Sequence, residues 1–309
     1  MHVFIGYLKR YFLEIRIGRF LITSLFVALL IFLNYRFGIE KYIRTVRPWG
    51  FGLVLFTLLY LFIFSTGFLL QRDKNPDRPE KKSGKILIVV AALLFALKII
   101  PWDIHLLFPG GPEDPWNNYF SIVLQLPLKL LMLLLGLSLI RKTVYPGEPF
   151  FGLSLKGFDP APYLTMLLFV IPLIALASTQ TDFLHTYPKV KTISFISDYA
   201  RHGWFYQLVY EISYGLDFVS IELFFRGFLV IGFARFAGIH AILPMAVFYC
   251  SIHFGKPLAE CISSYFGGIL LGVIAYRTRS ILGGLMVHLG LAWMMEIGGS
   301  LGHIYFNSR

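Results

Sequence analysis

Hydrophobic residues dominate this chain in long runs, and polar residues gather in the stretches between them. About 20 apolar residues are enough to cross a bilayer as an α-helix. Nine runs approach or exceed this length: 20–37, 49–70, 86–102, 119–140, 163–178, 204–236, 240–254, 258–276 and 281–305. The pattern therefore predicts an all-α, polytopic transmembrane helical bundle of eight or nine spans.

The polar connections between these runs differ in charge and composition. The 71–85 connection is basic, whereas 108–118 carries acidic residues and neither Lys nor Arg. The segment 141–162 is basic, broken by Pro and Gly, and interspersed with apolar residues, so we expect it to lie along the membrane interface. The first four spans are rich in leucine and nearly free of polar residues. We therefore interpret residues 1–200 as N-terminal scaffold spans and look for chemistry in residues 201–309.

The composition supports a multi-pass protein of the cell membrane. Of 309 residues, 57% are hydrophobic and 15% charged, whereas a soluble domain has about 25% charged residues. The net charge of +11 suits loops beside anionic lipid. Nothing resembles a nucleic-acid-binding module, so the expected partner is the bilayer. The two cysteines, Cys250 and Cys261, fall in or beside predicted spans, where we expect them to pack without a disulfide.

Small residues predict where helices approach closely. Ser264, Gly268 and Gly272 form a row of small residues with a spacing of four on the eighth predicted span. Such a row lets a second helix approach at short distance. Gly283, Gly284 and Gly290 narrow the ninth predicted span in the same way.

A glutamate and an arginine interrupt the apolar run 204–236. Glu222 and Arg226 are four residues apart, so on an α-helix they lie on one face and can pair. Ionisable residues at membrane depth are costly, which makes them candidates for a functional site. In that role the carboxylate activates water, and the guanidinium fixes the orientation of the carboxylate. The alternative is a buried ion pair that only holds helices together.

Two histidines follow in later spans. His253, near the end of the seventh span, is a candidate for holding water beside the carboxylate. His288, about two turns into the ninth span, is a candidate donor to a developing oxyanion. The structural alternative for His253 is a histidine at a helix end that faces carbonyls or headgroups. For His288 it is an interhelical hydrogen bond. Glu260, three residues after Pro257, matches the beginning of a helix.

Three motifs, in order and spacing, resemble the pattern of the CPBP family: Glu222-x-x-x-Arg226, Tyr249-x-x-x-His253 and His288-x-x-x-Ala292. The family comprises type II CAAX prenyl proteases, bacterial Abi proteins, and bacteriocin-processing or immunity proteins. The resemblance covers about 213–296. It implies that 201–309 is an intramembrane protease core in the last four spans, glutamate-dependent and metal-independent, with no cofactor and with a peptide or membrane protein as substrate.

Three positions depart from the family pattern, of which Tyr249, in place of a phenylalanine, is a mild change. Ile221 stands where the family has its first glutamate, which is taken as the water-activating base, and Ala292 replaces an asparagine that helps to hold the oxyanion. An aliphatic side chain cannot accept a proton. Either Glu222 takes the role of the base, or another acid such as Glu260 or Asp217 does, or the protein binds substrate without cutting it.

The resemblance implies a particular assignment of roles. Glu222 would act as general base, His253 would hold the water, His288 would support the oxyanion and Arg226 would orient the carboxylate, so that a peptide bond near the membrane surface is hydrolysed. The main alternative is a catalytically inactive relative that acts as a membrane binding or immunity protein. Two further alternatives are a proton-coupled transporter and a zinc site made from the glutamate and the two histidines.

Overall fold

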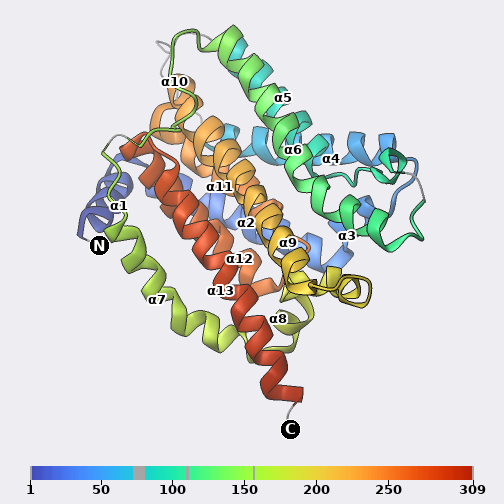
Figure 1. Ribbon diagram of the computed structural model, residues 1–309. Coiled ribbons are helices and arrows are strands. Elements are labelled where there is room, and N and C mark those ends of the chain that lie inside the picture. The colour runs from blue at the N-terminus through green and yellow to red at the C-terminus, as the bar shows by residue number, and fades with distance from the viewer. Residues whose placement is uncertain (1, 72–80, 109–110, 156, 308–309) are drawn as a thin grey trace. The chain divides into compact units, whose positions relative to one another are not determined.

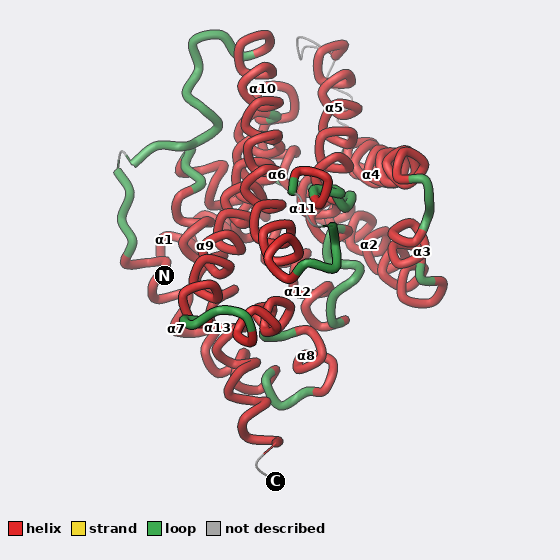
Figure 2. Tube along the Cα trace, turned by 45° about the vertical axis from the view of Figure 1, so that its right-hand side comes forward, coloured by secondary structure: helices red, strands yellow, loops and turns green. Residues whose placement is uncertain are grey.

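The computed structural model describes residues 2–71, 81–108, 111–155 and 157–307 (Figure 1). These residues form helices joined by loops and turns, and no strand occurs among them (Figure 2). Much of the basic 71–85 connection, and part of the acidic one, lie outside the described residues. The prediction of an all-α, polytopic helical bundle is confirmed.

Six helical segments in the described part of the chain are long and apolar enough to cross a membrane: Ile17–Phe37, Trp49–Leu70, Pro115–Val144, Gly203–Ser251, Leu258–Thr278 and Leu282–Phe306. The segment Gly203–Ser251 has 49 residues, more than twice the ~20 that one crossing needs, and the sequence predicts two spans there. Ala161–Ala177 is a shorter apolar helix. These lengths indicate an integral membrane protein, and the count of eight or nine crossings stays a prediction.

The chain divides into two compact units. The first comprises 1–100, 136–158 and 222–284, and the second comprises 101–135, 159–221 and 285–309. The division falls inside two long helices, α6 (Pro115–Val144) and α13 (Leu282–Asn307), and at the junction of α9 (Gly203–Glu222) with the helix that follows it. The functional division of the chain at residue 200 stays a prediction.

The first unit contains most of the N-terminal helices and most of the motif-bearing ones. Its complete helices are α1 (His2–Glu14), α2 (Ile17–Phe37), α3 (Ile39–Thr45), α4 (Trp49–Leu70), α5 (Lys81–Ile99), η3 (Leu223–Gly232), α10 (Ala234–Ala237), η4 (Gly238–Ala241), α11 (Ile242–Ser251) and α12 (Leu258–Thr278). Aromatic rings fill its core. Phe95 of α5 packs on Phe224 at 4.9 Å and on Phe225 at 5.1 Å between ring centroids. Such contacts join the scaffold helices directly to the motif.

The row of small residues on α12 brings α12 and α11 close together, as predicted. A Cβ at Gly268 would lie 3.4 Å from the Cα of Ala246, and one at Gly272 would lie 2.6 Å from the side chain of Met245. Both contacts are with α11, which runs beside α12 (Figure 1). Ser264, the third member of the row, is buried as well.

The second unit is built from helices on either side of the motif in sequence. It contains η1 (His105–Leu107), the first part of α6, α7 (Ala161–Ala177), α8 (Thr181–Thr186), η2 (Lys189–Asp198), most of α9 and most of α13. Tyr119 and Val123 of α6 pack with Ile193 and Ile196 of η2. The carboxylate of Glu296 accepts hydrogen bonds from the backbone N–H groups of Lys189 and Val190, which holds α13 to the beginning of η2.

Candidate active site

The Glu222–Arg226 ion pair lies at the centre of the candidate site. Arg226 Nη1 is 3.1 Å from Glu222 Oε1, and neither side chain has any exposed surface. A pair buried this completely repays its desolvation only if the two charges stay together. The predicted pairing is therefore present, in the environment where losing either partner costs most.

A π-helix follows Glu222, where the sequence pattern predicts a continuous α-helix. The α-helix α9 ends at Glu222, and η3 (Leu223–Gly232) forms hydrogen bonds between residues five apart. Phe151 packs against it: a Cβ at Gly227 would lie 2.7 Å from the Phe151 carbonyl oxygen, and one at Gly232 would lie 3.1 Å from the Phe151 ring. Short π-helical segments are rare and often occur at functional sites.

The segment 141–162 therefore contributes to the site as well as to the surface. Phe151 is 4% exposed, and its ring meets Phe228 of η3 at 5.6 Å. Leu153 and Leu155 are exposed, as an interfacial segment requires. That 141–162 lies along the interface stays a prediction, and Phe151 within it is inserted against the π-helix.

Tyr249 connects the ion pair with His253. The Arg226 guanidinium carbon lies 4.1 Å from the centroid of the Tyr249 ring, a cation–π geometry. The same ring meets the His253 imidazole edge-on at 4.8 Å between centroids. Glu222, Arg226, Tyr249 and His253 therefore form one continuous set of contacts inside the first unit.

His253 lies just beyond the end of α11, in a turn. Its backbone N–H donates to the Cys250 carbonyl at 3.0 Å, and its imidazole Nδ1 lies 3.0 Å from the Tyr249 carbonyl oxygen. Because a carbonyl can only accept, Nδ1 carries the proton of this hydrogen bond. In the neutral ring Nε2 is then the acceptor, which is the nitrogen that can hold a water proton.

Gly284 is a site residue that sequence reasoning did not single out for the site. A Cβ added at Gly284 would overlap Oε2 of Glu222, so the backbone of α13 lies directly against the carboxylate. In the sequence, the Gly283–Gly284 pair indicated a helix face without side chains. It did not indicate which residue packs against that face.

We predict that Gly284→Ala lowers stability by about 1–3 kcal/mol, the usual cost of overpacking a tight interior. The added methyl group forces a shift of the buried Glu222 carboxylate, whose other oxygen pairs with Arg226. Gly267→Ala in α12 is the matched control, because nothing lies within 4 Å of its Cβ position. It should be neutral or stabilising, since Ala favours a helix over Gly. Thermal unfolding in detergent measures both, and equal behaviour of the two variants would contradict the contact.

His288, Ile221 and Ala292 belong to the second unit. The His288 ring packs edge-on against Phe218 of α9 at 4.7 Å between centroids. Ile221 is 7% exposed and Ala292 is fully buried. The structure thus groups three predicted site residues in one unit and places His288 in the other.

The alternative acids have structural partners. Glu260 lies in the first turn of α12, where Pro257 is the N-cap, and its carboxylate is 3.3 Å from Lys256 Nζ. This confirms the helix start predicted there. Asp217 accepts the Ser220 hydroxyl at its backbone carbonyl at 2.6 Å. No three His, Cys, Asp or Glu side chains of the described ranges cluster as metal ligands do, and metal independence stays a prediction.

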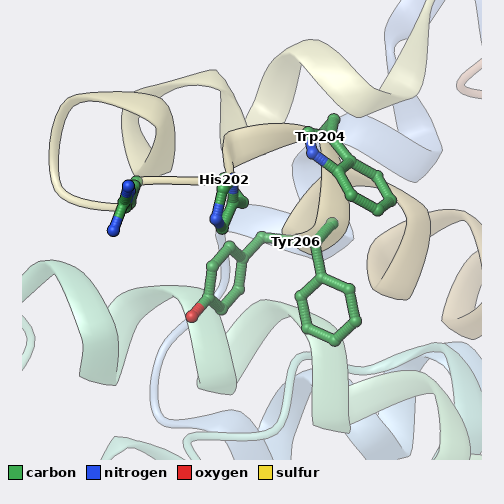
Figure 3. A pocket seen from close by; sticks show the side chains of 5 residues that line it. His202, Trp204 and Tyr206 are labelled. Carbon is green, nitrogen blue, oxygen red and sulfur yellow. The ribbon is translucent and has the colours of Figure 1, made fainter.

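A surface pocket occurs in the second unit at the beginning of α9. Its volume is about 260 Å³, and Figure 3 shows His202, Trp204 and Tyr206 among the residues that line it. Ligand sites are usually larger, about 300–1,000 Å³. Aromatic residues beside Arg201 are typical of the membrane–water boundary, and none of the four predicted site residues lines this pocket.

The helices and the buried ion pair define this chain as a polytopic integral membrane protein with a buried ionic site. Residues 204–294 match the family described as type II CAAX prenyl endopeptidase Rce1-like, which confirms the resemblance to the CPBP family. The match covers less than a third of the chain, and it shows a family to which this part of the chain is similar. Comparison with curated proteins and with solved structures gave no match.

Proposed function

We propose that this protein is a membrane-embedded, glutamate-dependent endopeptidase that hydrolyses a peptide bond near the membrane surface. The observation that carries the proposal is the contact series Glu222–Arg226–Tyr249–His253 inside the match region 204–294. It joins a carboxylate, its counter-ion and an imidazole, which are the groups that activate a water molecule.

Glu222 is our general base. Arg226 holds one carboxylate oxygen, and His253 holds the attacking water through Nε2. His288 stabilises the oxyanion of the tetrahedral intermediate, a role that a low-dielectric site strengthens. Since Glu222 is fully buried, the reaction includes a conformational step that admits water and substrate to the carboxylate.

An inactive membrane binding or immunity protein is the second candidate function. Ile221 favours it, because an aliphatic residue stands where the family has its first glutamate and cannot accept a proton. The full burial of Glu222 favours it too, because a carboxylate shielded from water serves equally well as a structural charge.

Cleavage of a membrane-peptide library by the purified full chain separates the two candidates. The library should include peptides with a prenylated C-terminus and unmodified transmembrane peptides, with products identified by mass spectrometry. We expect the wild-type protein to cleave, and His253→Ala and His288→Ala each to reduce the rate. Absence of cleavage by the wild type, or cleavage that neither variant affects, would contradict the assignment.

Ile221→Glu tests whether the missing carboxylate limits the activity. If Glu222 has taken the role of the base, we expect a second buried carboxylate to lower stability without raising the rate, since it lacks a partner. A gain of cleavage in Ile221→Glu over an inactive wild type would instead identify a decayed peptidase. The same library assay, with thermal unfolding alongside, measures both outcomes.

A further inference from the structure

The corner between α2 and α3, residues 34–40, lies against the turn that contains His253. The helix α2 ends at Phe37, and Gly38 turns the chain in the left-handed region with φ 63°. Gly38 N–H donates to the Asn34 carbonyl at 2.7 Å, and Glu40 N–H donates to Asn34 Oδ1 at 2.9 Å. Asn34 therefore caps the beginning of α3 with its side-chain oxygen, which leaves its amide nitrogen to bond elsewhere.

That amide nitrogen bonds to the His253 turn. Asn34 Nδ2 donates to the Phe254 carbonyl at 3.0 Å, and both residues are buried. The next residue of α2, Tyr35, donates its hydroxyl to the Lys256 carbonyl at 2.5 Å. Carbonyls beyond a helix end have no partner inside the helix, and a buried one is costly if left unsatisfied.

Glu40 of α3 also lies against the turn that contains His253. Its carboxylate pairs with Arg44, and a Cβ at Gly255 would lie 3.1 Å from Glu40 Oε2. The corner thus touches three consecutive residues after His253: the carbonyls of Phe254 and Lys256, and the backbone of Gly255.

His253 depends on this turn because it has left the helix. Its backbone is held by the Cys250 carbonyl on one side and by the Lys256 N–H, at 3.0 Å, on the other. Rotation of the turn would therefore move the imidazole away from the Tyr249 carbonyl and out of contact with the Tyr249 ring.

We propose that Asn34, supported by Tyr35, is a positioning residue for His253, so that the N-terminal α2–α3 corner completes a site whose motif lies more than 200 positions later in the sequence. Its bearing on catalysis rests on the proposed function of His253. The contact itself can be tested without any cleavage assay.

The rate at which diethyl pyrocarbonate modifies His253 reports how firmly the turn is held. It is measured by peptide mass spectrometry on the full chain in detergent, with the exposed His202 as internal reference. Asn34→Leu should raise the His253 rate, relative to His202, by about fivefold, the factor that corresponds to a hydrogen bond of ~1 kcal/mol. Tyr35→Phe should raise it less, because Tyr35 is partly exposed.

Thr23→Val is the matched control. Thr23 is a buried polar residue of the same helix, and its hydroxyl accepts a hydrogen bond from Gln71 Nε2 at 2.8 Å. Its replacement removes a buried interhelical bond of α2 that leads away from the His253 turn. We expect Thr23→Val to lower stability but to leave the modification rate of His253 unchanged.

Two results would overturn the inference: an unchanged His253 rate in both Asn34→Leu and Tyr35→Phe, or an equal increase in Thr23→Val. Tyr35→Phe serves alone if Asn34→Leu does not fold. When the wild type cleaves a library peptide, Asn34→Leu should lower kcat by a similar factor with KM unchanged. Failure of cleavage by the wild type would contradict the proposed function and leave the modification result standing by itself.

Discussion

Replacing Glu222 by Gln is expected to reduce peptide cleavage by about 10²–10⁴-fold, the usual contribution of a general base. Glutamine keeps the shape of the side chain and removes the group that takes the proton. Initial rates on a library peptide that the wild type cleaves measure the loss. Glu222→Gln also leaves Arg226 without its counter-charge. Rates are therefore compared at a temperature at which thermal-unfolding curves show that both proteins are folded.

Glu260→Gln is the discriminating comparison for that experiment. Glu260 lies in the first turn of α12 and pairs with Lys256, and about a fifth of its side chain is exposed. We expect this variant to keep its activity. Loss of cleavage in Glu260→Gln together with normal cleavage in Glu222→Gln would move the base to Glu260, and normal cleavage in both would remove glutamate dependence at these positions.

Replacing Arg226 by Ala is expected to destabilise the protein by about 3–5 kcal/mol, the range measured when one member of a buried pair is removed. Glu222 would remain buried without its counter-ion, and the face of the Tyr249 ring would lose the guanidinium that packs on it at 4.1 Å. Denaturant or thermal unfolding in detergent gives the change in the free energy of unfolding.

Arg235→Ala provides the control for Arg226→Ala. Arg235 pairs with Glu148 at 3.8 Å, and both side chains are about half exposed, so removing it should cost at most ~1 kcal/mol. The double replacement Glu222→Leu with Arg226→Met removes both charges and should recover most of the lost stability. Equal losses in Arg226→Ala and Arg235→Ala would show that the buried pair carries no special weight.

The two candidate functions predict different consequences for the Glu222 variant. A carboxylate that only balances Arg226 would affect stability and leave cleavage untouched once the protein is folded. A carboxylate that takes a proton would affect the rate beyond any loss of stability. The rate and the free energy of unfolding, measured on the same variants, therefore separate the peptidase from the inactive relative.

The sequence by itself determined the membrane class, the all-helical fold and the pairing of Glu222 with Arg226. These features depend on local quantities: the length of apolar runs, and the spacing of two residues on one helix. The row containing Gly268 and Gly272 also predicted a close helix contact correctly, because small residues on one helix face let the backbone of a second helix approach.

Only the tertiary structure decided what surrounds that pair. The π-helix after Glu222 was not predicted from the sequence pattern. The insertion of Phe151 against Gly227, the contact of Gly284 with the carboxylate, and the hydrogen bond from Asn34 to the His253 turn join residues far apart in the chain. No local pattern encodes which segment meets another, because a glycine or a buried amide has the same local preference whatever packs on it. Their roles follow from the partner, and only the folded chain supplies it.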